Sequence, residues 1–178
     1  NVAVGNCALK SNTEAWYNVG VGHGALHCNT TGEYNVSIGR QALNANTTGC
    51  ANIGLGRQSL WSNISGGCNV AIGHETGVAL TDGDQNIFMG YSSGRLVTTG
   101  GSNIMLGFCA GKCATTGNCN IFLGMEAGMG ASSSGVTGHN NYGIGCKSLT
   151  GLTSGVINLA VGPASGEKLT TGKYNILF

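Results

Sequence analysis

The stretch Asn35-Val36-Ser37-Ile38-Gly39 decides the fold, because its pattern repeats along the whole chain. An asparagine, two apolar residues at alternate positions and a closing glycine recur every 17 residues, with one step of 21. A fixed period of about 20 residues is typical of solenoids, in which each repeat stacks on its neighbours. The copies begin at Asn1, Asn18, Asn35, Asn52, Asn69, Asn86, Asn103, Asn120, Asn141 and Asn158, and a shortened copy begins at Asn175.

We number the positions of each repeat as slots 1 to 17 from its asparagine, and we call one repeat a rung. Slots 2 and 4 are apolar in nearly every rung, as at Val36 and Ile38. This alternation predicts a short strand at slots 2 to 4, and we expect slots 2 and 4 to face the interior and slot 3 to face outward. The invariant glycine at slot 5 predicts a bend with positive φ. The expected fold is all-β: a single-chain parallel β-solenoid with 17-residue rungs, about ten in number.

The 178 residues fit one solenoid domain, residues 1–178, in which two sub-blocks differ in their core residues. Rungs in 1–68 carry Leu at slot 9 and Asn at slot 12, whereas most rungs in 69–178 carry Gly at slot 9 and an apolar residue at slot 12. We expect one apolar side chain from either slot to fill the same part of the core. The step of 21 predicts an inserted loop near 132–140, where small, turn-forming residues gather.

Composition excludes several classes of function. Charged residues make up only 8% of the chain and the net charge is +1, which gives no electrostatic basis for binding nucleic acid or an anionic membrane. No apolar run is long enough for membrane insertion. No column pairs two carboxylates for acid–base chemistry, and His23, His27 and Cys28 are too few for a metal site. We therefore expect neither an enzyme nor a cofactor.

Two columns of large side chains predict an interface. Slot 6 carries Tyr91, Phe108 and Met125 in consecutive rungs. Slot 3 carries Phe88, Met105 and Phe122, and these should point outward if slots 2 and 4 point inward. Together the six side chains would form an exposed apolar patch, which favours a subunit contact. A platform for surface glycans and a locally altered core are the alternatives.

The lean core also favours association with copies of the same chain. Few large apolar side chains are available per rung, so burial against neighbouring chains would add stability. The first strand, with Val2, and the last, with Ile176 and Phe178, are in register with the repeat. We expect these strands to pair end to end between copies, because an open strand edge is a template for pairing. The alternative is that the sequence is part of a longer chain.

The eight cysteines predict disulfides and an oxidising compartment. Cys7 and Cys28 occupy slots 7 and 11 of adjacent rungs, and Cys109 and Cys113 occupy the same two slots of one rung. Cys50 and Cys68 occupy slots 16 and 17 of adjacent rungs, within plausible bridging distance. Buried free thiols are the alternative.

Four asparagines satisfy the N-glycosylation pattern Asn-x-Ser/Thr: Asn29, Asn35, Asn46 and Asn63. Three of them occupy slot 12, which we expect on a turn. The alternative is that Asn-Thr-Thr is the turn sequence of this repeat and carries no glycan.

The run Asn-Val-Ala-Val-Gly, followed by Ala-Leu and then Asn-Thr-Thr-Gly before the next asparagine, resembles two known repeats. One is the head repeat of trimeric autotransporter adhesins, and the other is the repeat of phage and virus tail-fibre proteins. The resemblance implies a β-solenoid that forms a structural segment of an extracellular fibre, filament or adhesin, at the cell or virion surface. The alternative is an ice-binding solenoid, because slot 13 gives a column of threonines: Thr13, Thr30, Thr47, Thr81, Thr98, Thr115, Thr153 and Thr170.

Overall fold

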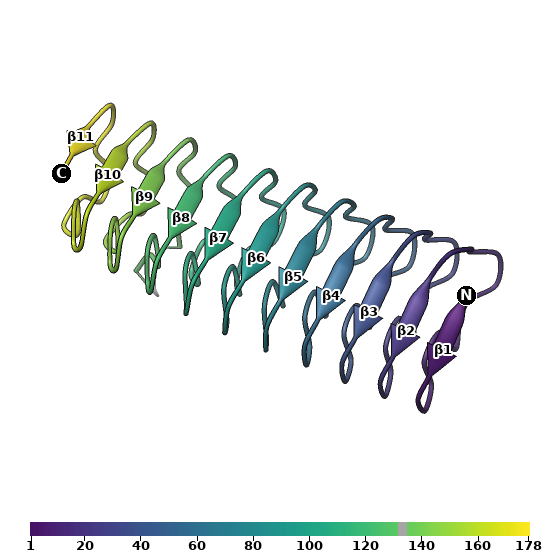
Figure 1. The fold of residues 1–178 in the computed structure, drawn as a ribbon. Helices are drawn as coiled ribbons and strands as arrows, with labels where there is room; N and C mark the ends of the chain where they lie inside the picture. Colours follow the sequence, from purple (N-terminus) through teal and green to yellow (C-terminus); the bar gives the residue numbers. More distant parts are fainter. Residues whose placement is uncertain (132–134) are drawn as a thin grey trace.

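Eleven short parallel strands, one from each repeat, form a single sheet in chain order from β1 to β11. The computed structural model describes residues 1–131 and 135–178, and it contains no helix in these residues. The strands succeed one another along a rod whose two chain ends lie far apart (Figure 1). This confirms the predicted all-β solenoid of about ten 17-residue rungs. The strands are β1 (Val2–Val4), β2 (Val19–Val21), β3 (Val36–Ile38), β4 (Ile53–Leu55), β5 (Val70–Ile72), β6 (Ile87–Met89), β7 (Ile104–Leu106), β8 (Ile121–Leu123), β9 (Tyr142–Ile144), β10 (Leu159–Val161) and β11 (Ile176–Leu177).

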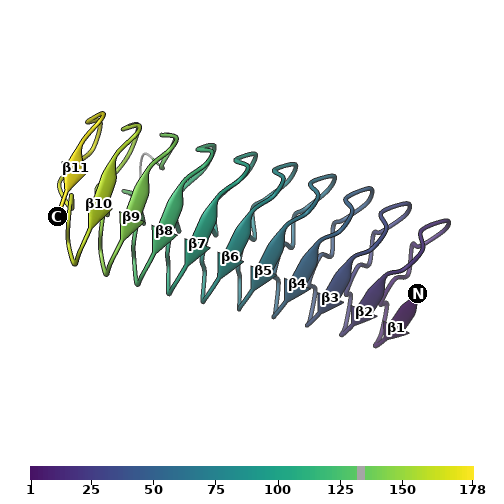
Figure 2. The same cartoon turned by 45° about the horizontal axis from the view of Figure 1, so that its top comes forward.

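Each strand pairs with the next so that identical slots lie side by side. In β3 and β4, for example, Val36 pairs with Ile53 and Ile38 pairs with Leu55. The same register holds for every pair of neighbouring strands, including β8 and β9 across the longer step. Side chains of one slot therefore form a column along the rod, and the turns between strands stack in the same way (Figure 2).

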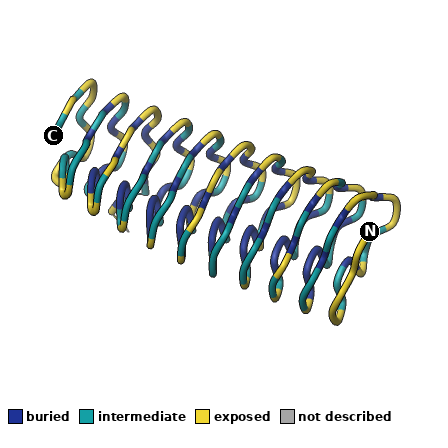
Figure 3. Tube along the Cα trace, viewed as in Figure 1, coloured by how far each residue is buried: buried dark blue, intermediate teal, exposed yellow. Residues whose placement is uncertain are grey.

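The strands face the opposite way from the sequence prediction. In β2 to β10 the middle residue, at slot 3, is buried, whereas slots 2 and 4 are half-buried or exposed. Phe88, Met105 and Phe122 are therefore fully buried instead of pointing outward. The slot-1 asparagines are interior residues, and alternation along an extended strand then places slot 3 inside and slots 2 and 4 outside. Figure 3 shows buried segments alternating with exposed ones around each rung.

The slot-1 asparagines form a hydrogen-bonded ladder inside the rod. The backbone N–H of Asn35 donates to Oδ1 of Asn18 over 2.9 Å, and Nδ2 of Asn35 donates to the carbonyl of Gly49 over 2.8 Å. Equivalent bonds recur from rung to rung, as for Asn52. The asparagines thus satisfy polar backbone groups that are buried beside the strands, which is the condition for burying them at all.

Slots 3, 8, 9 and 12 supply the apolar core. It runs from Leu9 to Ala160, with slot-9 leucines in the first four rungs and again at Leu149, and slot-3 Phe88, Met105 and Phe122 in the middle. The interior at slot 12 changes from asparagine to apolar side chains between Asn63 and Leu80, both fully buried.

The longer step brings an unexpected residue into the core. Val136 is fully buried and forms a parallel bridge with Ala114, so it takes the slot-12 position of its rung, whereas Ala131 is exposed. Part of the loop predicted near 132–140 falls on residues 132–134, which lie outside the described residues.

The slot-5 glycines adopt the expected positive φ, as at Gly39, whose φ is +137°. A β-carbon on Gly39 would lie 2.5 Å from the carbonyl oxygen of Gly56 in the next rung. The bends therefore stack so closely that no other residue fits there without displacing the backbone.

Candidate functional site: the outer face of the sheet

The candidate site is the outer face of the sheet, which we define as the side chains at slots 2 and 4 of β1 to β11. All of these side chains are apolar apart from the hydroxyl of Tyr142. Several are well exposed, among them Ile38 at 44% and Ile144 at 39%. The sheet therefore presents two parallel columns of aliphatic and aromatic side chains along the rod.

This face was missed from the sequence because slots 2 and 4 were assigned to the interior. The signal that could have found it is the asparagine at slot 1. An invariant asparagine next to a strand either lies at a solvent-exposed turn or forms an interior ladder. The interior ladder fixes the phase of the alternation, so that Val36 and Ile38 point outward and Ser37 points inward.

The slot-6 column flanks the outer face just beyond the C-terminal end of each strand. Tyr91, Phe108 and Met125 are each about half exposed, as predicted for these three residues. The rings of His74 and Tyr91 stack with centroids 5.4 Å apart, and those of Tyr91 and Phe108 stack at the same distance. Arg57 continues the column, with Nη1 lying 2.8 Å from Nε2 of His74.

The stacking in this column bears on what the aromatic rings can bind. The rings of Tyr91 and Phe108 face each other along the rod with an interplanar angle of 11°. Sugars stack on the open face of an aromatic ring, and these faces are occupied by neighbouring rings. The exposed ring edges suit lateral apolar packing better than glycan stacking.

The slot-17 column flanks the outer face on the other side, just before each strand begins. The rings of Tyr17 and Tyr34 stack there with centroids 5.0 Å apart. Near β9 to β11 an apolar groove of about 370 Å³ runs between this column and the outer face. Its lining residues are Tyr142, Ile157, Asn158, Leu159, Tyr174, Asn175 and Ile176.

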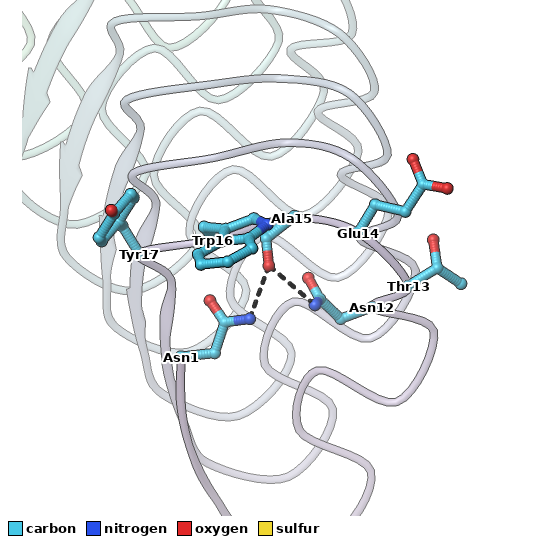
Figure 4. A pocket seen from close by; sticks show the side chains of 7 residues that line it. All are labelled: Asn1, Asn12, Thr13, Glu14, Ala15, Trp16 and Tyr17. Atoms are coloured by element: carbon cyan, nitrogen blue, oxygen red, sulfur yellow. Dashed lines mark hydrogen bonds between the residues drawn. The ribbon is translucent and has the colours of Figure 1, made fainter.

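Two further hollows lie at the first and last rungs. The first, of about 470 Å³, is lined by Trp16, Tyr17 and neighbouring residues. Figure 4 shows that the amides of Asn1 and Asn12 both point at the carbonyl of Ala15, over 2.6 and 3.1 Å. These amides thus hold the start of the two asparagine columns and are not free to bind a ligand. The other hollow, of about 500 Å³, lies beside Leu169 and Leu177.

The strand ends predicted to pair between copies are exposed. Val2, Ile176 and Phe178 have 51%, 69% and 90% of their surface accessible. Phe178 follows β11 at slot 4. This slot points outward in the fold, so Phe178 does not enter the core, contrary to the prediction that slot 4 faces inward. End-to-end pairing through these residues stays a prediction.

All eight cysteines are free thiols, so none of the three predicted disulfides is formed. For Cys50 and Cys68 the reason is visible: Sγ of Cys50 donates to the carbonyl of Thr48 and accepts from the backbone N–H of Glu33, which turns it toward the preceding rung. Cys109 and Cys113 are buried, and Cys7 and Cys28 are half-buried. Burial raises the pKa of the Cys109 thiol, and the alternative of buried thiols holds for this pair.

The predicted glycosylation sites are wrong for the folded chain. Asn29, Asn35, Asn46 and Asn63 are all fully buried, because they belong to the interior columns of slots 1 and 12. Nδ2 of Asn46, the atom that would carry a glycan, donates to Oδ1 of Asn29 over 2.8 Å and to the carbonyl of Gly49 over 3.0 Å. A glycan at these positions is incompatible with the stacked rungs.

The hydroxyls of the slot-13 threonines bond along the rod to the backbone of the next rung. The hydroxyl of Thr30 donates to the backbone carbonyl of Thr47, and that of Thr98 donates to the carbonyl of Thr115. The exposed column is slot 14. Threonines such as Thr31 and Thr48 share this column with acidic residues and serine. One mixed exposed rank differs from the two outward threonine ranks that an ice-binding face needs.

The charged side chains of the described residues are mostly isolated from one another. In the part of the chain that the structure describes, no three histidine, cysteine or acidic side chains come close enough to hold a metal ion. The ion pairs there are Arg57 and Arg95 with Glu75, and Lys147 with Glu126, at 3.9, 3.2 and 3.8 Å. Exposed pairs of this kind contribute little to stability. None of the described residues belongs to a helix able to cross a membrane.

Comparisons with protein-family models, with curated proteins and with solved structures found no match. The chain is therefore shown to be a parallel β-solenoid by its own fold, and the resemblance of its repeat to adhesin heads and tail fibres stays a prediction.

Proposed function

We propose that this chain is a structural segment of an extracellular fibre, filament or adhesin, and that copies of it assemble side by side through the outer face of the sheet. The observation that carries the proposal is the outer face itself, apolar at both outward positions of every strand. Apolar patches of this extent on soluble proteins mark interaction sites. The role outside the cell or on a virion is supported by the resemblance of the repeat to adhesin heads and tail fibres.

The dimensions of the face suit a stable contact between copies. Ten inter-strand steps of about 4.8 Å make the eleven-stranded sheet about 48 Å long. The strip from slot 17 to slot 6 spans seven residues and is about 20 Å wide at about 3.3 Å per residue. Its area is thus on the order of 1,000 Å², and stable interfaces bury about 800 Å² per partner.

A second copy of this chain is the occupant that fits the face best. The side chains repeat at the spacing of the strands, so an identical rod offers matching ridges along the full length. The slot-6 ring faces are already stacked on one another, so less open aromatic surface is left on which a sugar could stack. The low charge of the chain argues against nucleic acid as a partner.

The proposal is tested by the oligomeric state of the purified chain, measured by light scattering after size-exclusion chromatography. We expect an oligomer for the native sequence. Replacing Ile72 and Leu106 on the outer face by lysine should give a monomer, since it would bury two unpaired charges. Replacing Ile72 and Leu106 by methionine is the matched control, because it changes the same positions without adding charge, and it should leave the oligomer intact. A native chain that is monomeric at micromolar concentration would overturn the proposal.

The fibre role is tested in the source of the protein. Antibodies against the chain should label extended appendages in electron micrographs. Clear thermal hysteresis of the purified chain would instead support the ice-binding alternative. The slot-13 hydroxyls argue against it, because they are hydrogen-bonded to the backbone of the next rung.

A further inference from the structure

Charged side chains are sorted by column in the first 112 residues. All five basic residues there occupy slot 6 or slot 10, and four of the five acidic residues occupy slot 14 or slot 16. The basic residues are Lys10, Arg40, Arg57, Arg95 and Lys112, and the four acidic residues are Glu14, Glu33, Asp82 and Asp84. All nine are exposed or half-buried.

The two sets lie on opposite sides of the outer face. Slot 6 follows the glycine bend at the end of each strand. Slot 10 lies close to slot 6, because Nε of Arg95 at slot 10 reaches Oε2 of Glu75 at slot 7 over 3.2 Å. Slots 14 and 16 flank slot 15, whose carbonyl binds the asparagine at the start of the strand, as Gly32 binds Asn18 over 2.8 Å. We call the five basic residues the basic flank and the four acidic residues the acidic flank.

Among the first 112 residues, the one acidic residue outside this pattern does not cancel the basic flank. Glu75 at slot 7 is shared between Arg57 and Arg95, at 3.9 and 3.2 Å. One carboxylate facing two guanidinium groups leaves a net positive charge. Lys10, Arg40 and Lys112 form no ion pair with any described residue.

We infer that the two flanks make copies of this chain associate in parallel, with the basic flank of one copy against the acidic flank of the next. The inference rests on the proposed association through the outer face. Rotation of one rod about an axis parallel to its length brings the end of each strand opposite the start of the partner's strand, so unlike flanks meet. Rotation about an axis across the rods reverses one copy and brings like flanks together, which costs repulsion.

A specific pair follows from the register. Glu33 precedes β3 and Arg40 follows it, so the two residues lie at the same height of the rod on opposite flanks. In a parallel assembly whose rungs are level, Arg40 of one copy faces Glu33 of its neighbour. Neither side chain makes an ion pair in the described part of the chain, so both are available for this contact.

Orientation is tested by energy transfer between fluorophores attached to the terminal amine. Donor-labelled and acceptor-labelled chains are mixed, dissociated and reassembled. Parallel copies place the labels at one end of the assembly and should give strong transfer. Antiparallel copies place them about 48 Å or more apart, the length of the eleven-stranded sheet, and should give weak transfer. An oligomer with weak transfer overturns the parallel arrangement and leaves the proposed function standing, whereas a monomer overturns both.

The part played by the charges is tested by reversal and rescue. Arg40→Glu should raise the dissociation constant about three- to tenfold at low salt, and high salt should reduce the effect. Adding Glu33→Lys in the same chain exchanges the two charges and should restore the native value. Lys168→Glu, at exposed slot 11, is the matched control and should change nothing. A parallel oligomer that Arg40→Glu does not weaken, or that Glu33→Lys does not rescue, overturns the inference.

Discussion

Gly77 and Phe88 fit together as a complementary pair in the core. A β-carbon on Gly77 would lie 2.9 Å from Cδ2 of Phe88, so the ring occupies the space that a side chain at slot 9 would fill. In the first rungs the roles are exchanged: Leu43 fills slot 9, and its Cγ lies 3.3 Å from where a β-carbon on Gly54 at slot 3 would be. The ring of Phe88 also fills the space beside Gly94 at slot 9 of its own rung, where a β-carbon would lie 2.7 Å from Cδ1. The core volume is thus shared between slot 3 and slot 9 of the same and the preceding rung.

The first prediction tests this sharing of volume. Gly77→Leu should destabilise the fold, because the new side chain meets the ring of Phe88. Phe88→Gly should cost about 3 to 5 kcal/mol, because it leaves a cavity. The double variant should recover most of the loss. The backbone allows it, since φ is +60° at Gly77 and +50° at Leu60, the equivalent residue one rung earlier.

Unfolding midpoints in urea or on heating measure these effects. The change Gly77→Leu made in the Phe88→Gly background measures the cost of leucine at slot 9 without the ring. A double variant no more stable than the worse single variant would contradict the pairing.

The period predicted the fold correctly, but the direction of the side chains was wrong. Recurrence of Asn35-Val36-Ser37-Ile38-Gly39 defines the rung, the strand and the bend, because these depend on spacing alone. The direction in which the strand side chains point depends on which residues can be buried. In this rod the interior accepts asparagine at slot 1, since the amide satisfies buried backbone groups. The usual rule that apolar residues lie inside therefore misplaced Val36 and Ile38.

The second prediction concerns the end of the slot-12 asparagine column. Nδ2 of Asn63 donates to Oδ1 of Asn46 over 2.8 Å, but Oδ1 of Asn63 is buried without a donor because the next rung has Leu80. Asn46→Leu should cost about 1 to 2 kcal/mol more than Asn63→Leu, since it breaks the column in the middle and removes bonds on both sides.

Leucine fits the interior at slot 12 elsewhere, as Leu80 shows, so the two variants differ mainly in hydrogen bonding. Equal unfolding midpoints for the two variants would show that the column does not act as a connected network.

The third prediction concerns thiol reactivity. Cys119 and Cys146 are exposed and should react with an alkylating reagent within the folded protein at pH 8. Cys109 should react far more slowly, both because it is buried and because burial raises its pKa and leaves less thiolate at this pH.

Mass spectrometry of peptides after timed alkylation gives the rate at each position, with urea-unfolded protein as the control for intrinsic reactivity. Disulfide-linked peptides in protein prepared without reductant would contradict the free thiols seen at all eight positions.

The candidate site was only partly accessible from sequence, and for one physical reason. Tyr91, Phe108 and Met125 were placed correctly on the surface because slot 6 follows the bend, outside the alternation of the strand. Phe88, Met105 and Phe122 were assigned outward because large side chains at a normally small position suggested a patch. They are accommodated by the glycines at slot 9, because a β-carbon added at Gly94, Gly111 or Gly128 would meet the slot-3 side chain of the same rung. The prediction compared slot 9 with slot 12 alone and so missed this exchange of volume.

The last prediction concerns Ile157, a β-branched residue held at a φ of +57°. L-residues rarely adopt this conformation, and branching at the β-carbon makes it costlier. Equivalent slot-17 positions carry residues such as Asn140, at a φ of +58°, which tolerate it better. Ile157→Asn should therefore stabilise the isolated rod by about 1 kcal/mol, whereas Ile157→Val retains the strain and should not.

Ile157 also lines the apolar groove beside β10, so the same change should act on association in the opposite direction. If copies pack over this groove, Ile157→Asn raises the unfolding midpoint of dilute, monomeric protein and weakens the oligomer at higher concentration. Unfolding curves at several concentrations separate the two effects. If Ile157→Asn instead lowers the unfolding midpoint at every concentration, Ile157 is not strained in the isolated rod. That result would contradict the prediction.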